Sequence, residues 1–207
     1  MKMYVLYFVI ATVVIAGAAG GFHLYRVSTR NAKEMAEYSG SNETINKSFG
    51  RVLVVYYSLS GHTRDIAENI HTKINSDIYE IKTDPEIKAG PSLYLKTKSD
   101  LKMGVYPELQ GSMPDMGGYD FIFVGSPVWW YTVSTPVLAF LSKTDFKNKK
   151  VVPFSTQGSN SGTFFDDFVK MAKNANVTGY MSFNNMGKEY DRVVDNKISV
   201  WLNSLVP

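Results

Sequence analysis

The chain has 207 residues, a formal net charge of +3, 44% hydrophobic residues and 20% charged residues. This length and composition are typical of one globular domain with a small addition. There is no cysteine, which excludes disulfides, thiolate metal sites and cysteine nucleophiles. The only imidazoles, His23, His62 and His71, are not placed together, and the basic residues are scattered. These features argue against a metal site and against nucleic-acid binding.

The N-terminal segment 3–21 carries no charge over 19 residues. As a helix it would be roughly 28 Å long, close to the hydrocarbon thickness of a bilayer. A cleaved signal with Ala16-Gly17-Ala18 as its processing site, or a buried core helix, would also fit. The length favours an uncleaved anchor, because signal segments have shorter apolar cores. Basic residues after the segment favour a cytoplasmic location for the C-terminal domain.

The sequence therefore predicts three parts. Residues 1–22 form a membrane anchor or signal segment, and residues 23–50, rich in Ser, Asn, Glu and Lys, form a polar linker. Residues 51–207 form the folded domain.

Within the domain, apolar runs alternate with helical patterns. Buried or half-buried strands are expected at 51–57, 77–83, 119–127, 149–158 and 177–183. Helices are expected at 63–74, 92–103, 133–143, 161–175 and 188–205. This alternation predicts an α/β fold, with a doubly wound parallel sheet preceded by one N-terminal hydrophobic helix.

Polar or aromatic segments follow the first, third and fourth strands. They read SLSGHT from Ser58, GSPVWWYT from Gly125 and STQGSNSG from Ser155. Because parallel sheets bind ligands outside the carboxyl ends of their strands, we expect these segments to meet in one site.

The segment SLSGHT combines three hydroxyls, a glycine and the start of a helix, which together suit a phosphate group. Simple capping of the helix by Ser60 or Thr63 would account for the same residues. The Walker pattern and the GxGxxG pattern are both absent, which argues against nucleoside triphosphates and dinucleotides. His62 could contact a phosphate or face solvent.

The segment GSPVWWYT places Trp129, Trp130 and Tyr131 where a strand ends. Adjacent residues cannot all point into one core, so we expect at least one ring to face a planar ligand. One indole covering an apolar edge is the structural alternative. The small residues of STQGSNSG would let backbone N–H groups approach the same ligand.

These three motifs, in this order, resemble the flavodoxin family from Arg51 to the C-terminus, and the paired tryptophans resemble one subgroup of that family. The resemblance implies a five-stranded sheet in the order 2-1-3-4-5 that binds FMN. It also implies which residues hold the cofactor. The phosphate would be bound by Ser58, Leu59, Ser60, Gly61, His62 and Thr63. The flavin ring would be flanked by Pro127, Val128, Trp129, Trp130 and Tyr131 on one side, and by Ser155, Thr156, Gln157, Gly158 and Ser159 on the other.

The predicted function is electron transfer, or reduction of a quinone-like acceptor, through bound FMN. The alternative is a flavin-free, membrane-tethered interaction module with the same fold. An NAD(P)H-quinone reductase type of enzyme is one form of the first hypothesis, and no residue is assigned as catalytic. The expected partners are a redox protein or a small acceptor and the membrane, with no nucleic acid.

Overall fold

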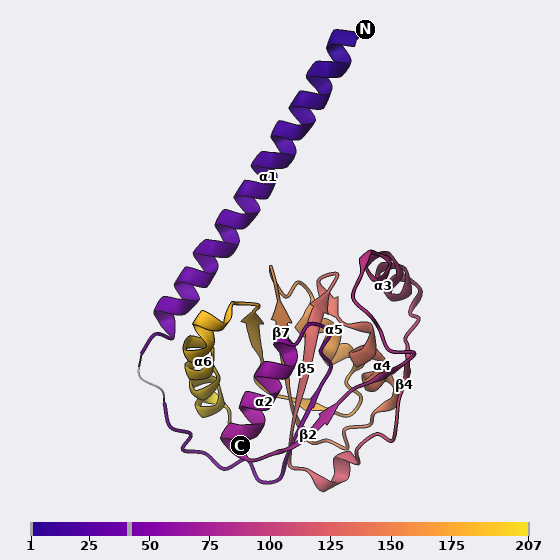
Figure 1. The fold of residues 1–207 in the computed structure, drawn as a ribbon. Helices are drawn as coiled ribbons and strands as arrows, with labels where there is room; N and C mark the ends of the chain where they lie inside the picture. The colour runs from indigo at the N-terminus through magenta and orange to yellow at the C-terminus, as the bar shows by residue number, and fades with distance from the viewer. Residues whose placement is uncertain (1, 41–42, 207) are drawn as a thin grey trace. The chain divides into compact units, whose positions relative to one another are not determined.

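The computed structural model describes residues 2–40 and 43–206 (Figure 1). Met1, Ser41, Asn42 and Pro207, which belong to the predicted segments, lie outside the described residues. The chain divides into two compact units, Met1–Gly40 and Ser41–Pro207.

The first unit is the helix α1 (Lys2–Glu37), which is 36 residues long. Its apolar residues from Met3 to Ile15 are exposed. Among the described residues, α1 is the one helix long and apolar enough to cross a membrane. The helix continues beyond the apolar segment through Arg26, Arg30 and Lys33.

The second unit contains a parallel sheet in the order β2-β1-β5-β7-β8, with β9 also paired to β7. Counting parallel strands along the chain, this is the order 2-1-3-4-5, so the predicted topology is confirmed. The strands are β1 (Val52–Tyr56), β2 (Asp77–Glu80), β5 (Phe121–Trp129), β7 (Lys150–Gln157), β8 (Asn176–Val177) and β9 (Met181–Asn184). The fifth strand is thus divided into β8 and β9, which pair with the two ends of β7.

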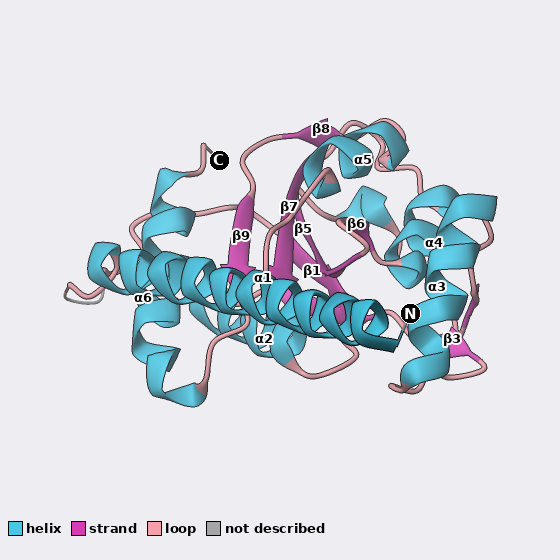
Figure 2. Ribbon diagram, turned by 90° about the horizontal axis from the view of Figure 1, so that it is seen from above, coloured by secondary structure: helices cyan, strands magenta, loops and turns pink. Residues whose placement is uncertain are grey.

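Helices cover both faces of the sheet (Figure 2). Both faces of β1 are therefore buried, and its successive side chains alternate between two apolar clusters. Leu53 and Val55 belong to one apolar cluster, and Val52 and Val54 belong to the other. The first cluster packs under α4 (Thr135–Lys143) and α5 (Phe164–Met171), and the second under α2 (His62–Ile74) and α6 (Asp191–Ser204). The predicted doubly wound α/β architecture is therefore confirmed.

The long connection between β2 and β5 forms small elements of its own. It contains β3 (Thr83–Asp84), α3 (Pro91–Met103), β4 (Glu108–Leu109) and the 3-10 helix η1 (Met116–Gly118). Strands β3 and β4 make a two-stranded antiparallel sheet, and α3 lies beside α4. The remaining elements are β6 (Thr132–Val133), antiparallel to β5, and the 3-10 helix η2 (Lys188–Tyr190).

Residues 43–50 pack on the domain as an extended strap. Phe49 is buried against Phe121 and Phe123. Along α6, the backbone N–H of Asn46 donates to the side chain of Asn203, and Lys47 donates to the carbonyl of Leu205. The compact unit thus includes this strap as well as residues 51–206.

Candidate functional site

The three segments singled out in the sequence lie at one edge of the sheet. Because β1, β5 and β7 are parallel neighbours, their carboxyl ends emerge together. A first loop (residues 57–61) joins β1 to α2, a hairpin tip (Trp130 and Tyr131) joins β5 to β6, and a third loop (residues 158–163) joins β7 to α5.

The first loop is shaped by Gly61, which precedes α2 with φ +99°, a conformation that glycine adopts readily. The Oγ atom of Ser58 accepts a hydrogen bond of 3.1 Å from the Gly61 N–H. No side-chain hydrogen bond caps α2, so the alternative in which Ser60 or Thr63 caps the helix does not apply. The N-terminal N–H groups of α2 therefore remain available to an anion.

Thr63, in the first turn of α2, contacts β7. Its hydroxyl lies 2.8 Å from the hydroxyl of Thr156, and Thr63 is 1% exposed. Ser60 is exposed on the loop, whereas Ser58, Leu59 and His62 are half-buried. The hydroxyl of Thr63 thus has a structural partner, and that of Ser60 is open to a ligand.

The residues predicted to flank the second side of the flavin ring, Ser155 to Ser159, are divided between β7 and the third loop. Ser155, Thr156 and Gln157 lie inside β7 and are buried, with the Ser155 hydroxyl donating to Gln157 Oε1 over 2.9 Å. Gly158 is exposed and Ser159 is half-buried in the third loop. Of these five residues, Gly158 and Ser159 are thus the most accessible to a ligand above the sheet edge.

The hairpin tip has an unusual backbone. Trp130 and Tyr131 have φ of +52° and +66°, between the paired residues Trp129 and Thr132. Two-residue hairpins of this kind favour Asn and Gly, and bulky residues there are strained by about 1–3 kcal/mol each. Pro127 and Val128, also predicted in the site, lie in β5 and are half-buried.

The three aromatic residues face different surroundings. Trp129 packs edge-to-face on Tyr57, with ring centroids 5.7 Å apart. Trp130 packs on Tyr94 of α3, with centroids 4.0 Å apart, and its Nε1–H donates to Thr97 Oγ1 over 3.2 Å. Tyr131 is 58% exposed. Tyr131 is therefore the most exposed of the three rings.

Contacts with α5 and the third loop hold the other side of the hairpin. The carbonyl of Tyr131 accepts a hydrogen bond of 2.8 Å from the N–H of Thr163. Asp167 Oδ2 accepts hydrogen bonds from the hydroxyls of Thr132 (2.7 Å) and Thr163 (2.6 Å). Burial tends to raise the pKa of Asp167, but these hydroxyls and the ammonium of Lys170 hold it below its usual value. The contact with Thr132 is not evident from the sequence, because Thr132 lies 35 residues before Asp167 in the chain.

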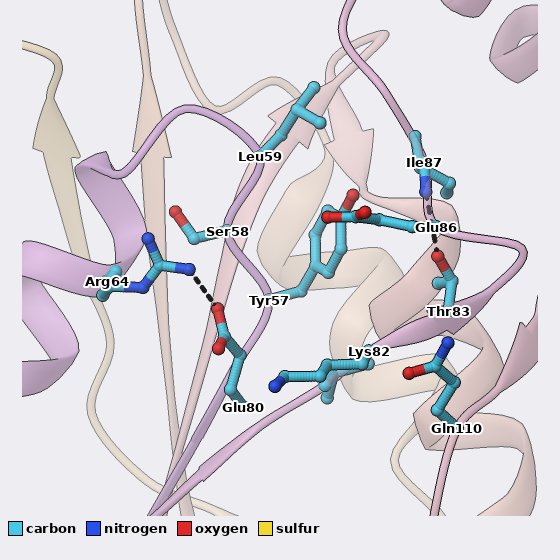
Figure 3. A pocket seen from close by; sticks show the side chains of 11 residues that line it. Tyr57, Ser58, Leu59, Arg64, Glu80, Lys82, Thr83, Glu86, Ile87 and Gln110 are labelled. Atoms are coloured by element: carbon cyan, nitrogen blue, oxygen red, sulfur yellow. Dashed lines mark hydrogen bonds and ion pairs between the residues drawn. The ribbon is translucent and has the colours of Figure 1, made fainter.

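A polar cavity of about 570 Å³ opens beside the first loop (Figure 3). Arg64 is held there by an ion pair with Glu80, which raises its pKa. Figure 3 shows the Tyr57 hydroxyl directed toward the Glu86 carboxylate. Burial, with the charges of Glu86 and Glu80, raises the pKa of Tyr57 to about 12. This cavity was not predicted, because its walls combine the first loop with residues 80–87 and Gln110, which are distant from that loop along the chain.

Comparisons with known proteins agree with this geometry. A sequence model described as flavodoxin matches residues 51–203. No curated protein sequence matches the chain significantly.

Several solved structures are similar. A flavoprotein from Lactobacillus acidophilus in complex with FMN is 26% identical; the match covers 73% of this chain and 98% of that one, with a TM-score of 0.59. The apo-form of the flavoprotein from that organism is 30% identical, covering 70% and 97%, with a TM-score of 0.51. A chain from Bacteroides uniformis, 22% identical, covers 76% and 100% with a TM-score of 0.65 and shares the fold.

Proposed function

The chain belongs to the flavodoxin family, and from this premise we propose that residues 41–207 form an FMN-binding redox domain. The single observation that carries the proposal is the first loop. It offers the exposed hydroxyl of Ser60 and the uncapped N-terminus of α2 at the carboxyl edge of a parallel sheet. The similarity to a flavoprotein whose structure contains FMN supports the same cofactor here.

The residues at this edge fit the parts of FMN. Ser58, Ser60, Gly61, His62 and Thr63 would surround the phosphate, with neutral donors and the helix N-terminus balancing its charge. Tyr131 and Trp129 would flank the planar ring, and Gly158 and Ser159 would approach it from the third loop. FMN would supply reversible uptake and release of electrons, and the protein would orient it and limit its contact with water.

We propose that the acceptor is quinone-like and that α1 anchors the domain in a membrane. Two features support the membrane anchor: the apolar length of α1, and the basic residues after its apolar segment, which favour a cytoplasmic domain. Cleavage of the segment and export of the domain is the alternative. Membrane fractions washed with alkaline carbonate should retain the full-length chain, whereas a shortened soluble chain would contradict the anchor.

The test of FMN binding is a visible absorption spectrum of residues 41–207, mixed with FMN and then desalted. Flavin bands should remain with the wild-type protein. Ser60→Ala should weaken FMN binding about 10- to 100-fold, as expected for loss of a hydrogen bond to a charged group. Ser99→Ala, at an exposed serine of α3, is the matched control and should bind FMN normally. A colourless wild-type domain would contradict the proposal and favour the interaction module instead.

A further inference from the structure

The outer face of α3 combines exposed apolar side chains with lysines. Leu95 is 73% exposed, Met103 is 64% exposed and Tyr94 is 63% exposed. Lys98 and Lys102 are exposed as well. Because side chains three, four, seven and eight positions apart lie on one side of a helix, both lysines share a face with Leu95 and Met103.

The inner face of α3 is already covered by the domain. Thr97 is buried, Leu101 packs against the apolar core and Leu93 is half-buried. The helix thus carries apolar side chains on both faces, whereas a surface helix normally carries polar residues toward solvent. Figure 1 shows α3 on the outside of the second unit, on the side away from α6. Exposed apolar side chains gathered on such a face indicate a binding surface.

The charge of α3 selects an anionic partner. The helix carries three lysines and one acidic residue, Asp100, whose carboxylate is paired with Lys96 over 2.6 Å. The ammonium groups of Lys98 and Lys102 are therefore left without an acidic partner within α3. The 13 residues of α3 account for two of the three net positive charges of the chain.

The surface of an anionic bilayer fits this mixture of groups. A lysine can bury its alkyl stem among apolar groups while its ammonium reaches the lipid phosphates. Helices that lie in a membrane interface combine lysines with apolar side chains in this way, and tyrosine is enriched at the same depth. In addition, α1 is long and apolar enough to cross a membrane, so a second element of the chain suits a bilayer. A protein partner would not require the lysines to lie among apolar side chains.

We propose that the outer face of α3 binds the surface of a bilayer that contains anionic lipids. This contact is distinct from the anchor, because α3 belongs to the folded unit and would bind lipid without α1. Since Trp130 of the hairpin tip packs on Tyr94 and donates to Thr97, a bilayer bound to α3 would lie beside the candidate site. Only this consequence rests on the proposed function; the binding itself does not.

The experiment is co-sedimentation of residues 41–207 with phosphatidylcholine vesicles, either pure or containing about 30% phosphatidylserine. This unit has its own buried core, and the similar Lactobacillus chain consists almost entirely of the matching region. Omitting α1 removes any binding through the anchor. We expect saturable binding to the anionic vesicles and binding about tenfold weaker to the pure ones. Raising the salt from about 0.1 M to about 0.5 M should weaken the anionic binding several-fold.

Two matched pairs of variants locate the contact. Lys102→Glu reverses a charge on the outer face and should weaken binding about tenfold, whereas Lys188→Glu, at an exposed lysine of η2, should change it less than about twofold. Leu95→Gln removes an apolar contact and should also weaken binding about tenfold. Its control is Val169→Gln, at a valine of α5 that is 53% exposed. Circular dichroism and thermal melts would show that all four variants are folded.

Three results would overturn the inference. Absence of saturable binding to anionic vesicles would leave the outer face of α3 to a protein partner. Equal binding to both kinds of vesicle would remove the role of charge. Equal losses in a variant and its control would place the contact elsewhere on the domain.

Failure of the proposed function gives a different result. Vesicle binding by a domain that retains no FMN in the absorption spectrum would exclude the redox function and leave the lipid contact standing. An FMN-bound domain that ignores anionic vesicles would do the reverse.

Discussion

The first loop and the hairpin tip lie at the same edge of the sheet, but different forces hold them. The first loop is local: Gly61 supplies the positive φ, and Ser58, three residues earlier, bonds its N–H. The hairpin tip places Trp130 and Tyr131 where glycine would be expected, and partners on α3 and α5 restrain it. The comparison shows that a loop governed by its own sequence preferences can be predicted, whereas one held by distant contacts cannot.

Substitutions that disturb the hairpin should lower the free energy of unfolding more than substitutions in the first loop. Gly162 has φ +55°, and a Cβ atom there would lie 2.3 Å from the carbonyl oxygen of Tyr131. Gly162→Val should therefore lower the free energy of unfolding by about 3 kcal/mol, which corresponds to about 6–12 °C in melting temperature. Gly158→Val, where a Cβ meets open space, should change it far less. Equal losses in a thermal melt would show that the hairpin contact is not special.

The contact between Tyr57 and Trp129 links the two regions. Because folding raises the pKa of Tyr57 to about 12, its stabilising effect is complete below pH 10 and is lost as the pH rises toward 12. Two pKa units correspond to at most about 2.7 kcal/mol. Urea unfolding at pH 9 and pH 11 should show a smaller alkaline loss for Tyr57→Phe than for the wild type. Tyr180→Phe, at an exposed tyrosine, should retain the wild-type loss.

Asp167 should stabilise the hairpin and not the first loop. Asp167→Asn removes a charge-assisted bond to Thr132 and Thr163 and should cost about 1–2 kcal/mol at pH 7. Because folding lowers the pKa of Asp167, its stabilising effect is present above the unfolded pKa and is lost as the pH falls through the folded pKa. The difference from the wild type should therefore shrink at pH 3. Asp166→Asn, at the exposed neighbour, is the control; a comparable loss there would remove Asp167 from this role.

The first loop should show the smallest loss of stability. Gly61→Ala introduces a Cβ into open space, so the cost is that of the positive φ, about 1 kcal/mol. Gly158→Ala has no such φ and should be nearly neutral. Denaturant midpoints would measure both. A loss from Gly61→Ala larger than that from Gly162→Val would reverse the comparison.

The same distinction separates the features that the sequence predicts from those that it does not. Strands β1, β5 and β7 are predicted by long apolar runs, and their parallel order brings the three segments to one edge. The division of the last strand is not predicted, because the strand is interrupted at residues 178–180, where Gly179 has φ +62° and a Cβ would lie 2.4 Å from a methyl group of Leu205. Likewise, α3 determines where Trp130 packs, and no local pattern near Trp130 contains that information.

The strap that precedes β1 has a mechanical consequence. Residues 43–50 are bonded along α6, through Asn46 to Asn203 and through Lys47 to the carbonyl of Leu205. A pulling force applied through the N-terminal helix therefore reaches α6 before it loads strand β1. Force on α1 would separate the strap from α6 first, and the sheet edge that carries the candidate site would be shielded until those bonds had broken.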